Sequence, residues 1–287
     1  MHIYICTAHN VRKRAGRCFI ALLGMAAIIQ LVACAKVPWP DEEDVPDYLK
    51  VYALTSTKIV AHRGYWNIKG SAENSIAAID RAAETGLYAT EFDVRLTADS
   101  VPVICHDPKI QNWTIETTPY AQIRNFKLPN GETLPTLSQY LTHAKKKRLR
   151  LFLEIKTTDQ NDYNMRATRI TVEAVDALNM REQVEYMSFS TAVCREILRL
   201  SPKASVSFLG GTIPPSEIKK ARLSGLCYHY DFFRQHPEWI PEAHALGLFV
   251  GAWTVNDVQL MHDLVMQEID YIITDKPALL QKMLNQP

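Results

Sequence analysis

Residues 58–107 read KIVAHRGYWNIKGSAENSIAAIDRAAETGLYATEFDVRLTADSVPVICHD. Apolar runs separated by polar and helix-forming segments predict a strand, a loop and helix, a second strand, and a short hairpin that returns with a histidine at its tip. Polar side chains accompany each predicted strand end: His62 and Arg63, then Glu91 and Asp93, then His106 and Asp107. Two imidazoles, a guanidinium and several carboxylates therefore come together within fifty residues.

Glu91 and Asp93 are two residues apart on a predicted strand, so their side chains leave the same face of the sheet. Phe92 leaves the opposite face, toward whatever packs behind the sheet. Two neighbouring carboxylates repel each other unless a cation or a shared proton lies between them. Carboxylate oxygens are the ligands that calcium and magnesium prefer, so the pair predicts a site for one divalent cation, Ca²⁺ or Mg²⁺.

The same alternation of strand and helix continues to the end of the chain. Strand-like runs occupy residues 58–62, 90–94, 149–156, 184–190, 204–210, 226–233, 248–255 and 271–275. Helix-like segments lie between them, and one more follows the last strand. Eight such units over about 230 residues predict an α/β fold of the (β/α)8 TIM-barrel type, as a single domain over residues 58–287. A doubly wound open sheet is the main alternative, although no glycine-rich phosphate loop follows the first strand.

Four short motifs occur in a fixed order in this domain: HRG at 62–64, EN at 73–74, ExD at 91–93 and HD at 106–107. Together they resemble the glycerophosphodiester phosphodiesterase family, and the resemblance extends from Lys58 to about Pro277. The family usually carries a larger insertion after the position of Asp107 than the short connection found here. Contacts that such an insertion makes with substrate are therefore not implied for this chain.

The resemblance implies roles for individual residues. Carboxylates at the positions of Glu91, Asp93 and Glu154 hold the metal ion, since EIK at 154–156 also matches the family. Histidines at the positions of His62 and His106 perform acid and base catalysis, while Arg63 and Lys156 contact the substrate phosphate. Strand parity independently places Glu154 and Lys156 on one face. The alternative is an ordinary buried salt bridge of Glu154 with Lys156 or Arg63.

Four further residues are expected near this site. Trp253 ends a predicted strand, where it packs either on the glycerol or alcohol part of a substrate or on the barrel core. Asn74 and Asp107 are expected to orient the two histidines. We interpret Asp275 as a structural cap of the last helix, which starts at Pro277.

The resemblance implies hydrolysis of a small-molecule glycerophosphodiester to glycerol 3-phosphate and an alcohol. The attacking oxygen is either water or the neighbouring glycerol hydroxyl, and the sequence leaves both routes open, as it does the assignment of acid and base. One alternative is a related barrel phospholipase or phosphodiesterase that acts on a lipid or inositol headgroup. Another is a non-catalytic surface lipoprotein, although binding alone needs no paired acid and base.

The amino-terminal segment resembles a lipoprotein signal peptide over residues 1–33. Four basic residues between 12 and 17 precede the apolar run 19–33, and LVAC ends at Cys34, the residue that would carry the lipid. The alternative is an uncleaved anchor helix. Residues 34–57 contain three prolines and the acidic run 41–44, which predicts an extended, solvated tether.

This arrangement places the domain outside the cytoplasm, anchored to a membrane on its periplasmic or outer-membrane face. None of the 31 acidic residues precedes Cys34, so the mature chain carries a weak negative charge and no nucleic-acid partner is expected. No obligate protein partner is implied. The three cysteines within the domain are expected to be buried free thiols.

Overall fold

The computed structural model describes residues 44–51 and 55–284. The chain divides into two compact units, residues 1–37 and 38–287, and all of the described residues belong to the second. The predicted signal peptide and Cys34 lie outside the described residues. Among the described helices, none is long and apolar enough to cross a membrane.

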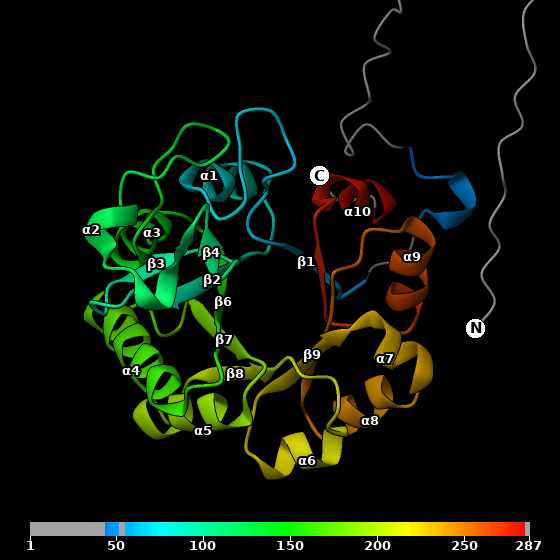
Figure 1. The fold of residues 1–287 in the computed structure, drawn as a ribbon. Helices are drawn as coiled ribbons and strands as arrows, with labels where there is room; N and C mark the ends of the chain where they lie inside the picture. Colours follow the sequence, from blue (N-terminus) through cyan, green and yellow to red (C-terminus); the bar gives the residue numbers. More distant parts are fainter. Residues whose placement is uncertain (1–43, 52–54, 285–287) are drawn as a thin grey trace, which may run out of the picture. The chain divides into compact units, whose positions relative to one another are not determined.

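Eight parallel strands form a closed barrel (Figure 1). They are β1 (Lys58–Ala61), β2 (Ala89–Leu96), β6 (Arg150–Ile155), β7 (Val184–Ser188), β8 (Ser205–Phe208), β9 (Gly225–His229), β10 (Phe249–Trp253) and β11 (Tyr271–Thr274). Strand β1 pairs with both β11 and β2, so the sheet has no open edge at this point. The predicted (β/α)8 barrel is confirmed, and the open doubly wound sheet is wrong.

Helices surround these strands, as Figure 1 shows. The principal ones are α1 (Ile76–Glu84), α3 (Leu137–Ala144), α4 (Asn161–Ala177), α5 (Thr191–Leu200), α6 (Pro215–Lys220), α8 (Trp239–Ala245), α9 (Val258–Met266) and α10 (Pro277–Met283). Side-chain caps begin several of them: Ser75, Thr136, Ser190 and Asp257 each accept a hydrogen bond from a backbone N–H of the first turn. Each barrel strand is followed by a helix that packs against the outside of the barrel.

One predicted strand, 226–233, is too long. Its second half forms helix α7 (Tyr230–Gln235), which begins directly after β9. The His229 ring accepts a hydrogen bond from the Asp231 backbone N–H at 3.4 Å, and Phe233 is buried beneath the helix. Aromatic residues favour strands in isolation, but here the cap and the buried Phe233 support a helical turn.

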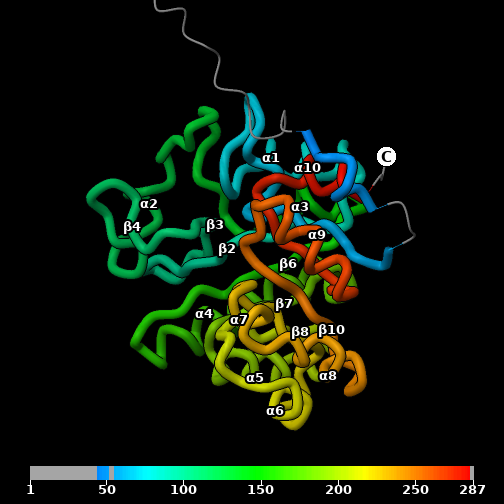
Figure 2. The backbone as a smooth tube through the Cα atoms, turned by 90° about the vertical axis from the view of Figure 1, so that its right-hand side faces the viewer, coloured from blue at the N-terminus to red at the C-terminus, as the bar shows by residue number. Residues whose placement is uncertain are grey.

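Between β2 and β6 the chain forms a small satellite segment, residues 105–135. It contains β4 (Lys109–Ile110), β5 (Trp113–Thr114), the 3₁₀ turn η3 (Ile115–Thr117) and α2 (Tyr120–Ile123). Strand β3 (Pro102–Ile104) leads into it and pairs antiparallel with β2. The segment has its own apolar core, built around Ile110, Ile115 and Ile123. Figure 2 shows it projecting beyond the ring of helices.

The predicted tether is wrong for its described part. Val45, Leu49 and Val51 are buried, and the 3₁₀ turn η2 (Asp47–Leu49) packs next to α9. The Val51 backbone N–H donates to the Met283 carbonyl at 2.8 Å. Apolar side chains spaced through a proline-containing stretch give it a surface to bury, and that burial outweighs the tendency to stay extended.

Candidate active site

A cavity of about 110 Å³ lies at the carboxyl end of the barrel. Its wall contains His62, Arg63, Glu91, His106, Glu154, Lys156 and Trp253, together with apolar side chains. These residues come from five different segments, yet each lies in or directly after a strand. The closed barrel brings the ends of the parallel strands to one mouth. His106 reaches it by another route, because β3 runs back antiparallel along β2.

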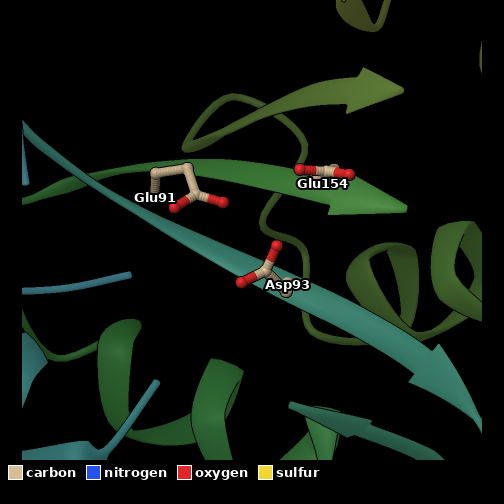
Figure 3. Close-up of side chains that lie close together, drawn as sticks. All are labelled: Glu91, Asp93 and Glu154. Atoms are coloured by element: carbon tan, nitrogen blue, oxygen red, sulfur yellow. The ribbon is translucent and has the colours of Figure 1, made fainter. Parts of the chain in front are cut away.

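Three carboxylates lie close together on two neighbouring strands (Figure 3), and two of them, Glu91 and Glu154, line the cavity. Asp93 on β2 is in register with Glu154 on β6, and Glu91 precedes Asp93 by two residues. One oxygen from each of Glu91, Asp93 and Glu154 lies within 4.8 Å of the others, and all three residues are buried. Phe92 points the other way and packs on Tyr140, with ring centroids 4.4 Å apart, as strand parity predicted.

Burial and mutual repulsion shift the pKa values of these acids. Burial, followed by the charges of Asp93 and Glu154, raises the pKa of Glu91 well above its usual range. Burial and then Asp93 raise the pKa of Glu154 to about 7. Burial also acts to raise the pKa of Asp93, but Lys156 and other neighbouring groups outweigh it and leave that pKa lowered. Additional positive charge nearby would therefore stabilise this cluster of buried carboxylates.

Two basic side chains of the protein, Lys156 and Arg63, lie next to these carboxylates. Lys156 Nζ lies 3.0 Å from Asp93 Oδ1 and 2.9 Å from Glu154 Oε1, so the predicted salt bridge exists within the cluster. Glu91 accepts only the Arg63 backbone N–H, at 2.7 Å, among the described hydrogen-bond donors. Of the three buried carboxylates, Asp93 and Glu154 therefore contact the Lys156 ammonium group, and Glu91 is paired with a backbone N–H instead. Their hard oxygen donors therefore fit a divalent cation of the calcium or magnesium kind.

The conformation of the HRG motif explains how Arg63 reaches the cluster. Arg63 adopts a left-handed backbone conformation with φ of 53°, followed by Gly64 with φ of 84°. A Cβ on Gly64 would lie 2.4 Å from the Ala78 Cβ, so only glycine fits there. The turn aims the Arg63 N–H at Glu91, while its guanidinium Nη1 bonds Glu73 at 2.7 Å. Arg63 Nε is buried and has no hydrogen-bond acceptor among the described residues.

Each histidine is paired with a carboxylate through Nδ1. His62 Nδ1 lies 2.8 Å from Asp275 Oδ1, and His106 Nδ1 lies 2.8 Å from Asp107 Oδ1. If Nδ1–H donates to the carboxylate, Nε2 remains available to accept or donate a proton on the other side of the ring. Burial lowers the pKa of His106, although Asp93 acts in the opposite direction.

The site so built matches a known family model over residues 62–279, that of the glycerophosphoryl diester phosphodiesterase family. The chain belongs to this family. The resemblance stated from the motifs is therefore confirmed, and the non-catalytic lipoprotein is wrong, because this is a family of enzymes.

Relatives and solved structures agree with the family assignment. A glycerophosphodiester phosphodiesterase of Caldanaerobacter subterraneus is 27% identical over 241 residues, which cover 78% of this chain and 96% of the relative. The crystal structure of a glycerophosphodiester phosphodiesterase from Parabacteroides distasonis is 43% identical, with a TM-score of 0.80, and the match covers 81% of this chain and 98% of that one. An Oleispira antarctica phosphodiesterase in complex with sn-glycerol-3-phosphate is 25% identical, with a TM-score of 0.68 and coverage of 79% and 96%.

The two residues of this phosphodiesterase that were expected to orient the histidines, Asn74 and Asp107, make different contacts. Asn74 does not contact a histidine: its side-chain N–H donates to Asp93 Oδ2 at 2.9 Å, and its Oδ1 accepts the Asp93 backbone N–H at 3.2 Å. Its left-handed conformation, with φ of 59°, turns the amide toward β2. Asp107 does contact His106, as predicted.

Asp275 contacts His62, and the sequence interpretation missed this contact. It is not the N-cap of α10, which is Lys276 and makes no side-chain capping bond. Its Oδ1 accepts from His62 and from Trp66 Nε1 at 3.1 Å, and its Oδ2 accepts from Asn256 at 2.7 Å. Its position directly after the last strand, at the same mouth as His62, is the signal that could have identified it.

Trp253 stands at the edge of the cavity in an aromatic wall. Its indole N–H donates to the Cys227 carbonyl at 2.8 Å, which fixes the ring. Phe189 and His229 meet it edge-on, at centroid distances of 5.5 and 5.3 Å. Phe189 is 45% exposed, so this wall offers apolar surface at the entrance.

A wider groove of about 670 Å³ adjoins the cavity. It lies between the loop 66–74 and the satellite segment, and His106 lines both spaces. The connection after Asp107, although short, thus builds one wall of a groove beside the cavity.

Proposed function

We propose that this enzyme hydrolyses glycerophosphodiesters to glycerol 3-phosphate and an alcohol, with one bound divalent cation. The observation that carries the proposal is one cavity whose wall holds two histidines, two carboxylates of the acidic cluster and two basic side chains. Each of the two histidines is paired with an aspartate through Nδ1. The product complex of the Oleispira relative supports glycerol 3-phosphate as the product class.

Glu91, Asp93 and Glu154 would hold the cation, either Ca²⁺ or Mg²⁺. When bound, it would neutralise negative charge on the phosphoryl group. Burial and the neighbouring carboxylates raise the pKa values of Glu91 and Glu154, and a bound cation would stabilise the charged form of both.

Arg63 and Lys156 bind the phosphate of the diester. Arg63 Nε is buried without an acceptor among the described residues, and a phosphate oxygen in the cavity would satisfy it. Lys156, held by Asp93 and Glu154, places a second charge at the same wall. A phosphodiester anion resists attack by another electron-rich oxygen, so this positive field is needed before a nucleophile can approach.

His62 and His106 move the protons. One accepts the proton of the attacking oxygen, which belongs to water or to the neighbouring glycerol hydroxyl. The other donates a proton to the alcohol oxygen as its bond to phosphorus breaks. Asp275 and Asp107 each keep Nδ1 occupied, so that Nε2 is the reacting nitrogen. Trp253 packs against the glycerol portion.

A panel of glycerophosphodiesters tests this proposal, with release of glycerol 3-phosphate as the measurement. We expect turnover with deacylated diesters, none with intact phospholipids, and loss of turnover in excess chelator with recovery on adding Ca²⁺ or Mg²⁺. Glu91→Gln should weaken cation binding measured by calorimetry. Glu185→Gln is the matched control, because Glu185 is also buried in the barrel but bonds only Ser207 at 2.7 Å, away from the cluster.

Full activity in excess chelator would contradict the role of the cation. Release of a headgroup from intact phospholipids instead would favour the alternative barrel phospholipase. Equal cation binding by the Glu91→Gln and Glu185→Gln variants would show that the acidic cluster is not the metal site.

We also propose that Cys34 is the mature amino terminus and carries lipid, which would anchor the enzyme to a membrane outside the cytoplasm. The sequence LVAC after a basic segment and an apolar run supports this. Mass spectrometry of the membrane fraction should find acylated Cys34, and Cys34→Ser should block processing. A mature protein that retains Met1 would contradict the proposal.

A further inference from the structure

The amino end of the barrel, opposite the active site, carries a concentration of basic residues. They lie in four turns that lead into the neighbouring strands β6, β7, β8 and β9. This basic arc consists of Lys145, Lys146, Lys147, Arg148, Arg150, Arg181, Lys203, Lys219, Lys220 and Arg222. Within turns 145–150, 178–183, 201–204 and 219–224, Glu182 is the one acidic residue. These four neighbouring turns therefore carry a local excess of cations in a chain whose total charge is nearly balanced.

Much of this charge is not neutralised locally. Lys147 pairs with Asp80 at 2.6 Å, Lys220 with Glu217 at 2.6 Å, and Arg181 with Asp176. Lys145 and Arg150 donate to backbone carbonyls and keep their full charge. The remaining five cations are exposed, and no carboxylate of the described chain pairs with them: Lys146, Arg148, Lys203, Lys219 and Arg222.

Apolar side chains are also exposed at this end of the barrel. Phe249 begins β10 and is 47% exposed, and Met266 ends α9 and is 63% exposed. The Phe249 backbone N–H donates to the Ser224 carbonyl at 3.0 Å, so this ring lies next to the turn of Arg222. Phe249 also packs on Tyr271, with centroids 5.9 Å apart, which fixes its base while its outer part faces solvent.

We propose that this amino face of the barrel docks on an anionic lipid bilayer. Lysine and arginine near a membrane surface are attracted to anionic headgroups, and protruding aromatic and thioether side chains enter the headgroup region. A nucleic acid would use the charges but would give Phe249 and Met266 no apolar surface. Docking at this end leaves the catalytic cavity, at the other end of the barrel, open to water and to water-soluble diesters.

The test compares partition of the full chain into phosphatidylglycerol/phosphatidylcholine vesicles and into pure phosphatidylcholine vesicles. Lys146→Gln, Arg148→Gln and Lys203→Gln together should lower the preference for anionic vesicles about 100-fold, at roughly fivefold per charge. The matched control is Lys109→Gln, Arg124→Gln and Lys127→Gln, three exposed cations of the satellite segment. Every variant carries the same residues 1–43, so any difference comes from the substituted face.

Phe249→Ser should lower partition a further tenfold or so, since it removes an apolar side chain that would enter the bilayer. Turnover of a soluble diester should stay unchanged in the amino-face variants, which verifies that they are folded. Equal losses for the amino-face and satellite triple variants would overturn the proposal. So would unchanged partition of Phe249→Ser together with displacement of the protein from vesicles by duplex DNA, which would show a surface for polyanions in general.

Discussion

The two histidine–aspartate pairs of the candidate active site have the same hydrogen-bond distance, but they differ greatly in their exposure to solvent. Both Nδ1–Oδ1 distances are 2.8 Å. The side chains of His62 and Asp275 are 19% and 21% exposed, whereas those of His106 and Asp107 are 36% and 73% exposed. Asp275 comes from the other end of the chain and is held by Trp66 and Asn256, while Asp107 is simply the next residue.

This difference indicates how each imidazole is positioned. His62 has its orientation fixed by the closure of the barrel, because its partner is itself held by two further hydrogen bonds. The exposed His106–Asp107 bond competes with water and contributes less to holding the ring. His106 lines both the cavity and the wider groove, so its ring stands between the two spaces.

Replacing either histidine should have the largest effect. We expect His62→Ala and His106→Ala each to lower kcat about 10²- to 10⁴-fold, because both proton transfers belong to one step. The double variant should lose much less than the product of the two single losses. Steady-state kinetics with a glycerophosphodiester gives these values.

His143→Ala is the matched control, since His143 bonds Asp80 at 2.8 Å on the outside of the barrel. Its turnover should stay near that of the unchanged enzyme. Near-normal turnover of both His62→Ala and His106→Ala with metal bound would rule out the proposed mechanism.

A substrate with an activated leaving group should show which histidine is the acid and which is the base. A nitrophenyl diester departs without protonation, so it should restore the variant that lacks the acid by 10-fold or more relative to a choline diester. The variant that lacks the base should stay slow with both substrates. We expect His106→Ala to be the restored variant if the alcohol leaves through the groove. Equal restoration of both variants would contradict separate acid and base roles.

Replacing the carboxylate of the more buried pair should lower kcat more than replacing that of the more exposed pair. Asp275→Asn should lower kcat about 10- to 100-fold, because it disturbs the orientation and tautomer of a buried imidazole. Asp107→Asn should cost only a few-fold, since water can replace an exposed partner. The same kinetic assay measures both. Equal losses would show that burial of the pair does not decide its contribution.

The sequence was sufficient for most of the barrel and for the cluster of three carboxylates. Regular alternation of apolar strands with helices specifies the fold, and the period of two along a strand places Glu91 and Asp93 on one face. Glu154 and Lys156 follow by the same parity on the next parallel strand. These inferences needed only local spacing and the rule that strand ends meet at one mouth.

The features that sequence interpretation missed depend on contacts between distant segments of the chain. The bond between His62 and Asp275 joins residues 213 apart, and a local interpretation assigned Asp275 to the nearest helix instead. Asn74 turns toward Asp93 because of a left-handed backbone conformation that no spacing pattern reveals. Likewise, Val45 and Leu49 pack on helices from the end of the chain, which their proline-rich context did not suggest.

The smallest expected effect is on stability in acid. Burial acts to raise the pKa of Asp275, but the bonds from His62, Asn256 and Trp66 outweigh it and leave that pKa below the ordinary value of 3.8. A carboxyl group with a lowered folded pKa stabilises the protein fully above its unfolded pKa, and this stabilisation is lost as pH falls through the folded pKa. Urea unfolding should therefore show Asp275→Asn to be less stable than the unchanged enzyme at pH 6, with a difference that shrinks below about pH 4. Asp107→Asn, with its exposed side chain, is the control, and a difference for Asp275→Asn that stays constant from pH 6 to pH 3 would show that its carboxylate charge is not what stabilises the fold.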